Sequence, residues 1–274
     1  MPCVLHGRAL RHYMGNIGFP LAPHPYYELL GDDIGLLASE GASGYFAQGA
    51  TGGGADMSEL NSYLIGRKTV DPGANTSELV RGFVSGFYGD EAAPHVHNYL
   101  HLMSTAAMTY GATGTLCQAE SCPDLSAGRD FSPSSVFFAN ETVVATATAM
   151  WNAAKAVASL PAPGSAGKQQ QADYALRVAR SSLSINYIVL LRWEMYYDWV
   201  TATQGKAWPL ATADKRQFFE TQFAPIYNLS VTEIAVPTCN EWTNGPGPSG
   251  HQCWNKAGNL SEFENYLFPS APPL

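Results

Sequence analysis

A single β-type segment followed by a long series of helical patterns is the feature that most restricts the fold of this chain of 274 residues. Residues 43–48 have the small, aromatic and apolar side chains of a short buried strand, and a glycine-rich loop occupies residues 49–54. One strand cannot form a sheet, because its backbone N–H and C=O groups need a neighbour. Either this strand pairs with polypeptide outside the sequence, or residues 4–10 supply one more strand.

Helical periodicity dominates the remainder of the chain. An amphipathic segment covers residues 29–37, and we expect helices at residues 56–70, 76–89, 94–110, 132–160, 170–203 and 212–227. A linker is expected at residues 161–167. This order predicts a mainly α-helical protein, with the C-terminal remnant of a (β/α)8 TIM-type barrel followed by a helical array. The expected units are the last βα units of a glycosidase-like barrel (residues 1–72), a helical domain (73–230) and an irregular tail containing cysteine and tryptophan (231–274).

Composition excludes several classes of protein. Hydrophobic residues make up 46% of the chain, which is enough for a sizeable core and excludes a wholly disordered chain. The net charge is −8 and there is no run of Lys or Arg, so nucleic acid is not an expected partner. No apolar stretch reaches the roughly 18 residues of a membrane-spanning helix, so no membrane partner is expected either.

Cysteine spacing and N-x-S/T triplets indicate a secreted or lumenal protein. The chain has five cysteines, of which four form two closely spaced pairs in Gly-, Pro- and Ser-rich loops; the expected disulfides are Cys117–Cys122 and Cys239–Cys253. Acceptor triplets for N-glycosylation begin at Asn75, Asn140, Asn228 and Asn259. The first residues lack the pattern of a signal peptide, so a secreted origin predicts a fragment or a mis-started gene product.

The glycine-rich loop between strand and helix predicts a ligand site, because glycines allow close backbone approach and a helix start exposes N–H groups. A dinucleotide site is disfavoured, since the loop lacks the G-x-G-x-x-G spacing. A sugar site fits better: in a barrel this loop lies on the catalytic face, where Gln48, Asp56 and Glu59 would bond hydroxyl groups. The alternative is that Asp56 caps the next helix and Glu59 completes a capping box.

Two further clusters carry less weight. His97 and His101 are spaced as metal ligands on a helix, with His95 nearby, but no third ligand is apparent, so a surface helix is the preferred interpretation and neither a metal nor a cofactor is expected. Glu194 and Asp198 share one helical face, where two neighbouring carboxylates do not flank a glycosidic bond. Core packing of the surrounding aromatic residues, with a solvated acidic edge, explains them.

Several motifs together resemble a known family. Residues 13–25 (YMGNIGFPLAPHP) resemble Y-x-G-N-F…L-x-P-x-P, and residues 33–49 (DIGLLASEGASGYFAQG) resemble N-I-R-x-x-x-E-x-G-V-x-G-V-F-x-Q-G. Residues 56–64 (DMSELNSYL) resemble E-F-x-E-L-R-x-Y-L, and residues 87–94 (FYGDEAAP) resemble G-Y-Y-G-x-A-A-P. Over roughly residues 10–200 the chain resembles the domain of unknown function family 4838, which is glycoside-hydrolase-like and related to endo-β-N-acetylglucosaminidases.

The resemblance implies a function on glycans, including β-N-acetylglucosaminides. It places Asn16, Gln48, Asp56 and Glu59 at the sugar-facing edge of a barrel whose last strands lie here, and it implies a carboxylate mechanism. The general acid and the N-terminal half of the barrel are expected on polypeptide outside this sequence. The isolated chain is therefore expected to lack hydrolase activity, although the full-length protein would be a glycosidase.

The chain departs from the family pattern at three positions. Ala47 stands where many members have Glu, Asp56 replaces Glu, and Val70 replaces Trp. The change at Ala47 removes one possible contact to a sugar. The competing hypothesis is a non-catalytic helical module that binds carbohydrate or acts as a scaffold.

Overall fold

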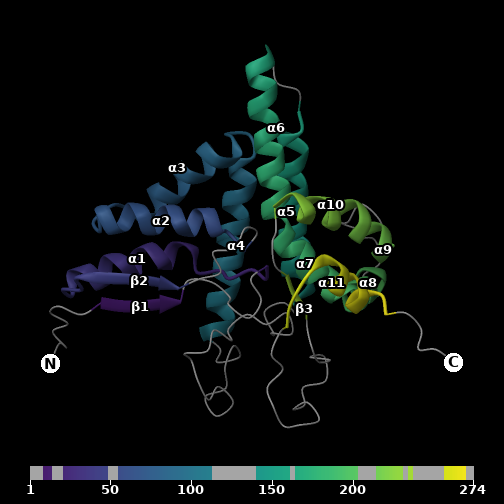
Figure 1. Ribbon diagram of the computed structural model, residues 1–274, viewed down its shortest axis with the longest axis horizontal. Coiled ribbons are helices and arrows are strands. Elements are labelled where there is room, and N and C mark those ends of the chain that lie inside the picture. Colours follow the sequence, from purple (N-terminus) through teal and green to yellow (C-terminus); the bar gives the residue numbers. More distant parts are fainter. Residues whose placement is uncertain are drawn as a thin grey trace, which may run out of the picture.

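The computed structural model describes residues 9–13, 21–48, 55–112, 140–160, 164–202, 214–230, 234–236 and 256–269. It is mainly helical, as expected (Figure 1). In Figure 1 the strands β1 and β2 with helices α1 to α3 lie on one side, α4 to α6 run through the middle, and α7 to α11 lie on the other side. Asn16 and the cysteines of both expected disulfides (Cys117–Cys122 and Cys239–Cys253) lie outside the described residues.

The strand at residues 43–48 has a partner within the chain. Strand β1 (Ala9–Tyr13) pairs in parallel with β2 (Gly44–Gln48), with Ala9 opposite Gly44 and Tyr13 opposite Gln48. A second strand in the N-terminal segment is one of the two expected alternatives; β1 overlaps the expected residues 4–10 at Ala9 and Leu10, and the residues before Ala9 lie outside the described ranges. Parallel strands need a crossover connection, which here contains α1 (Tyr27–Ser39). The Phe46 side chain is 57% exposed, on the strand face opposite to Tyr45 and Ala47, which pack against the core.

Helices α2 (Ser58–Val70) and α3 (Thr76–Tyr88) pack with α1. The Asp71-Pro72-Gly73 turn ends α2 as expected, since proline cannot continue a helix. Helices α1 and α3 approach closely at Gly31, where an added Cβ would lie 2.5 Å from the Thr76 methyl carbon. The Thr76 hydroxyl donates to Asp32 on α1 at 2.6 Å, which fixes this crossing.

The middle of the molecule consists of α4 (Ala93–Ala112), α5 (Glu141–Ala158) and α6 (Gly164–Ser181), with α5 packed against both neighbours. Tyr99 and Trp151 are buried where α4 meets α5, with ring centroids 5.0 Å apart. The linker expected at residues 161–167 is wrong from residue 164 onward, because α6 begins there.

The single helix expected over residues 170–203 is wrong: it is broken at Ser182 and Arg192 into α6, α7 (Leu183–Leu191) and α8 (Trp193–Ala202). Near the first break, the hydroxyls of Ser182 and Ser184 donate to backbone carbonyls three residues earlier, which competes with the helical bonds. Every residue of α7 is buried, so the helix lies inside the molecule.

The C-terminal part contains more regular structure than expected. The helix expected at residues 212–227 is α9 (Lys215–Phe218), a π-helical turn η3 (Phe219–Phe223) and α10 (Ala224–Ser230). The irregular tail is a wrong prediction where β3 (Ile234–Val236) pairs antiparallel with β4 (Lys256–Gly258) before α11 (Leu260–Leu267).

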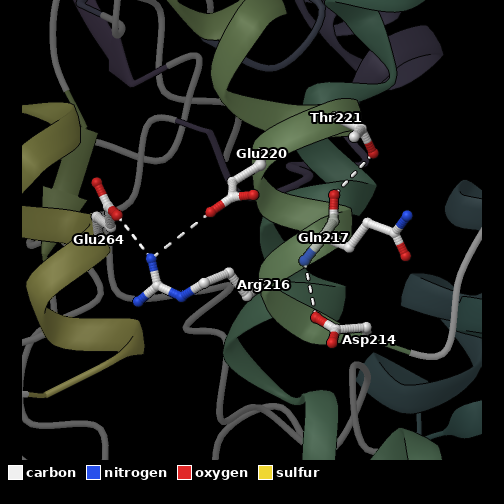
Figure 2. A network of polar contacts seen from close by, with 6 residues as sticks. All are labelled: Asp214, Arg216, Gln217, Glu220, Thr221 and Glu264. Atoms are coloured by element: carbon white, nitrogen blue, oxygen red, sulfur yellow. Dashed lines mark hydrogen bonds and ion pairs between the residues drawn. The ribbon is translucent and has the colours of Figure 1, made fainter.

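Helix α11 is joined to α9 by a surface ion pair and by apolar packing. Arg216 forms ion pairs with Glu264 at 2.8 Å and with Glu220 at 3.8 Å (Figure 2). Phe263 is fully buried against Tyr187, Phe219 and Phe223. Burial of this aromatic ring stabilises the contact more than the exposed charges do.

Candidate functional site

The candidate site consists of residues that follow the two parallel strands in the sequence. Strands β1 and β2 end at Tyr13 and Gln48, and parallel strands end at the same edge of a sheet. In α/β proteins ligands bind at this edge. The next described residues form a turn at residues 55–57, which holds Asp56, and then α2, which carries Glu59 in its first turn. Two of the four sequence-predicted residues, Asp56 and Glu59, therefore lie close together, and Gln48 is the last residue of β2.

Asp56 is buried and holds two segments together. Its Oδ2 accepts hydrogen bonds from the His24 backbone N–H at 2.9 Å and from the Tyr27 hydroxyl at 2.8 Å. The side chain does not cap α2, whose N-cap is Met57 with no side-chain bond. The capping-box interpretation of Asp56 and Glu59 is therefore wrong.

The environment of Asp56 favours its protonated form. Burial raises the pKa of this carboxyl from 3.8 to about 6, against the lowering effect of polar contacts with the His24 N–H, the Ser184 hydroxyl and the Tyr27 hydroxyl. Among the described residues, Asp56 takes part in no ion pair and its Oδ1 has no hydrogen-bond partner. A carboxyl in this position titrates at mildly acidic pH.

Buried phenol groups surround the carboxyl. Burial and the Asp56 charge raise the pKa of the Tyr27 and Tyr99 hydroxyls well above the usual value, so both remain neutral hydrogen-bond donors. The Tyr99 hydroxyl has polar contacts with the Tyr27 hydroxyl and with the Trp151 indole N–H. Sequence reasoning missed these residues, because an aromatic side chain on an apolar helix face has the same pattern as ordinary core packing.

Glu59 lies nearer the surface and pairs with a cation from a distant helix. Its Oε1 is 2.8 Å from Arg180 Nη2 on α6, and both side chains are about 30% exposed. The Ser58 hydroxyl donates to the other carboxylate oxygen at 3.0 Å. An ion pair that is partly exposed contributes only about 0–1 kcal/mol, so a ligand hydroxyl can replace either partner at small cost. Arg180 was missed because nothing in the sequence links it to α2.

The histidine cluster noted in the sequence lies on α4. His95, His97 and His101 are on α4, at half-buried or exposed positions. Within the ranges that the structure describes, no group of three or more His, Cys, Asp or Glu side chains is arranged to hold a metal ion. None of the helices in those ranges is long and apolar enough to cross a bilayer.

Three of the four glycosylation triplets begin at helix N-caps. Asn75, Asn140 and Asn259 each accept a hydrogen bond from a backbone N–H through Oδ1, at the starts of α3, α5 and α11. Asn75 and Asn259 are exposed and Asn140 is half-buried. Asn228, the fourth, is exposed on α10. In each cap the amide nitrogen, which would carry a glycan, is not the atom that accepts the bond.

The β1–α1–β2 unit and the helices that follow it also carry the family signal. Residues 9–101 match the family model described as Domain of unknown function (DUF4838). The match begins at β1 and ends within α4, so it includes both candidate carboxyls but covers less of the chain than the motif resemblance over residues 10–200. Neither a curated protein nor a solved structure matches the chain.

Proposed function

We propose that this chain is the C-terminal portion of a glycoside-hydrolase-like protein and that the edge formed by Gln48, Asp56 and Glu59 faces a glycan. The carrying observation is that Asp56 and Glu59 follow strand β2 of a parallel β–α–β unit in the chain, as site residues follow the strands of barrel enzymes. The DUF4838 match over the same residues supports this assignment. β-N-Acetylglucosaminides are the proposed substrate class, from the family resemblance.

The roles that we propose for Glu59, Arg180 and Asp56 follow from how exposed their side chains are. Glu59 and Arg180 are partly exposed and would bond sugar hydroxyls, while Asp56 holds the turn that positions Glu59. The Asp56 carboxyl is buried on the His24 N–H and the Tyr27 hydroxyl, and Glu59 is paired with Arg180, so we propose that this chain binds glycan without cleaving it. The general acid and the remaining barrel strands would come from further polypeptide.

Titration calorimetry of the purified chain with chito-oligosaccharides tests binding. We expect saturable binding that Glu59→Gln and Arg180→Gln each weaken by at least tenfold. Glu78→Gln, which changes an exposed carboxyl on α3, is the matched control and should bind like the original chain. If no glycan binds, the proposal fails and the helical scaffold hypothesis is favoured.

A chromogenic β-N-acetylglucosaminide tests for cleavage. Release of the chromophore by the purified chain, at a rate that tracks protein concentration, would contradict the proposed absence of activity.

We also propose a secreted or lumenal location. The four N-x-S/T triplets support it, since three of them begin at exposed asparagines. Expression in a secreting eukaryotic cell should give a mass that falls on treatment with an N-glycosidase. An unchanged mass would count against the proposed location.

A further inference from the structure

The turn at residues 55–57 has a strained backbone next to a buried acid. Met57 has φ 47° and ψ 31°, and it is the one non-glycine residue with positive φ within the described ranges. A left-handed conformation costs an ordinary residue roughly 1–2 kcal/mol, and such strain persists only where the surroundings enforce it. Here the Met57 side chain is buried, and the Tyr88 hydroxyl lies 3.5 Å from its sulfur.

The adjacent Asp56 connects this turn to several parts of the molecule. It binds the His24 N–H and the Tyr27 hydroxyl, and Ser184 of α7 also contacts it. These contacts connect the turn to the segment around His24 and Tyr27 and to α7. A neutral carboxyl tolerates that position, whereas a carboxylate with no cation beside it gains free energy by reaching water.

We propose that residues 55–57 form a proton-controlled latch, closed while the Asp56 carboxyl is protonated and opened when it ionises. Opening carries the carboxylate toward solvent and relaxes the left-handed Met57, so the strain lowers the free energy needed to open. It also uncovers the hydroxyls of Tyr27 and Tyr99. The raised pKa of Asp56, about 6, places the change between mildly acidic and neutral pH.

Few of the groups that face Asp56 can change their charge in this pH range. The phenols of Tyr27, Tyr88 and Tyr99 come from α1, α3 and α4, and burial raises the pKa of each above the usual value, so none ionises near pH 6. Glu59 and Arg180 compensate each other's charge. Among the described residues, His24 is a further titratable side chain next to Asp56, and it serves as the control.

Hydrogen exchange of the whole chain, corrected for the intrinsic effect of pH, tests the latch. We expect protection of the amides of residues 55–60 to fall at least tenfold between pH 5 and pH 8, relative to the amides of α7, which report global unfolding. Asp56→Asn should abolish this relative change, and His24→Gln should retain it. Equal relative protection at both pH values overturns the latch, as does a response that survives Asp56→Asn.

A second variant keeps the test decisive if Asp56→Asn does not fold. Tyr27→Phe removes a hydrogen bond that lowers the pKa of Asp56, so the midpoint of the exchange change should move to higher pH. A purely structural role of Tyr27 would lower protection at every pH without moving the midpoint. A midpoint that stays fixed or moves to lower pH would overturn the proposal.

Discussion

Replacing Asp56 with Asn should stabilise the folded protein at neutral pH. Burial raises the pKa of Asp56 from 3.8 in its ordinary state to about 6. The folded state therefore binds this proton more tightly than the unfolded state. The stabilisation that this bound proton gives the folded state is complete below pH 4 and is lost as the pH rises through 6. A shift of about two units corresponds to about 3 kcal/mol. Asn keeps an oxygen for the His24 and Tyr27 donors and carries no charge.

Urea unfolding followed by circular dichroism at pH 4 to 8 measures this difference. We expect the free energy of unfolding of the original chain to fall by up to about 3 kcal/mol relative to Asp56→Asn over that range, with equal slopes against urea. Asp90→Asn, at an exposed position, should follow the original chain. If the original chain and Asp56→Asn keep a constant difference from pH 4 to pH 8, the carboxyl does not carry the cost of burial assigned to it.

Three further changes test the fold. Gly89→Ala should lower the free energy of unfolding by several kcal/mol, because φ is 83° and the added Cβ would lie 2.7 Å from the Tyr174 ring. Gly41→Ala, where φ is 85° and no atom lies near the added Cβ, should lower it by only about 1 kcal/mol. Equal losses in the two variants would refute the steric argument. Asn259→Ala should lower the free energy of unfolding by about 1 kcal/mol, because it removes the capping box of α11, whereas Asn259→Asp should nearly preserve it. A loss seen only with Asn259→Asp would contradict the role of Asn259 as the cap. Phe263→Ala should lower the free energy of unfolding, measured with urea, by about 3–5 kcal/mol, and Arg216→Ala should lower it by about 1 kcal/mol. A larger loss for Arg216→Ala would mean that the ion pairs, and not the buried ring, are the main contact between α9 and α11.

Local sequence signals predicted the elements whose ends are set by local chemistry. The strand at residues 43–48 and the end of α2 at Asp71-Pro72 follow from β-type side chains and from proline, and both are confirmed. The break at Ser182 was not predictable from periodicity, since the apolar pattern continues through it. The Ser182 and Ser184 hydroxyls at this break donate to backbone carbonyls three residues earlier, and apolar periodicity does not report such bonds.

Only those residues of the candidate site that are close together in the sequence could be predicted from it. Asp56 and Glu59 stood out because they follow a strand and a glycine-rich loop. Tyr99, Trp151 and Arg180 lie far away in the sequence and reach the same place through helix packing, which no spacing rule reveals. Burial also changed the expected role of Asp56, which binds Tyr27 instead of capping α2.

The interruptions at Ser182 and Arg192 divide what would otherwise be one long helix. An unbroken straight rod over residues 164–202 would extend for about 58 Å, well past the edge of a core built from helices of ordinary length. The two interruptions set apart its most apolar part, the nine residues of α7, every one of which is buried among the neighbouring helices.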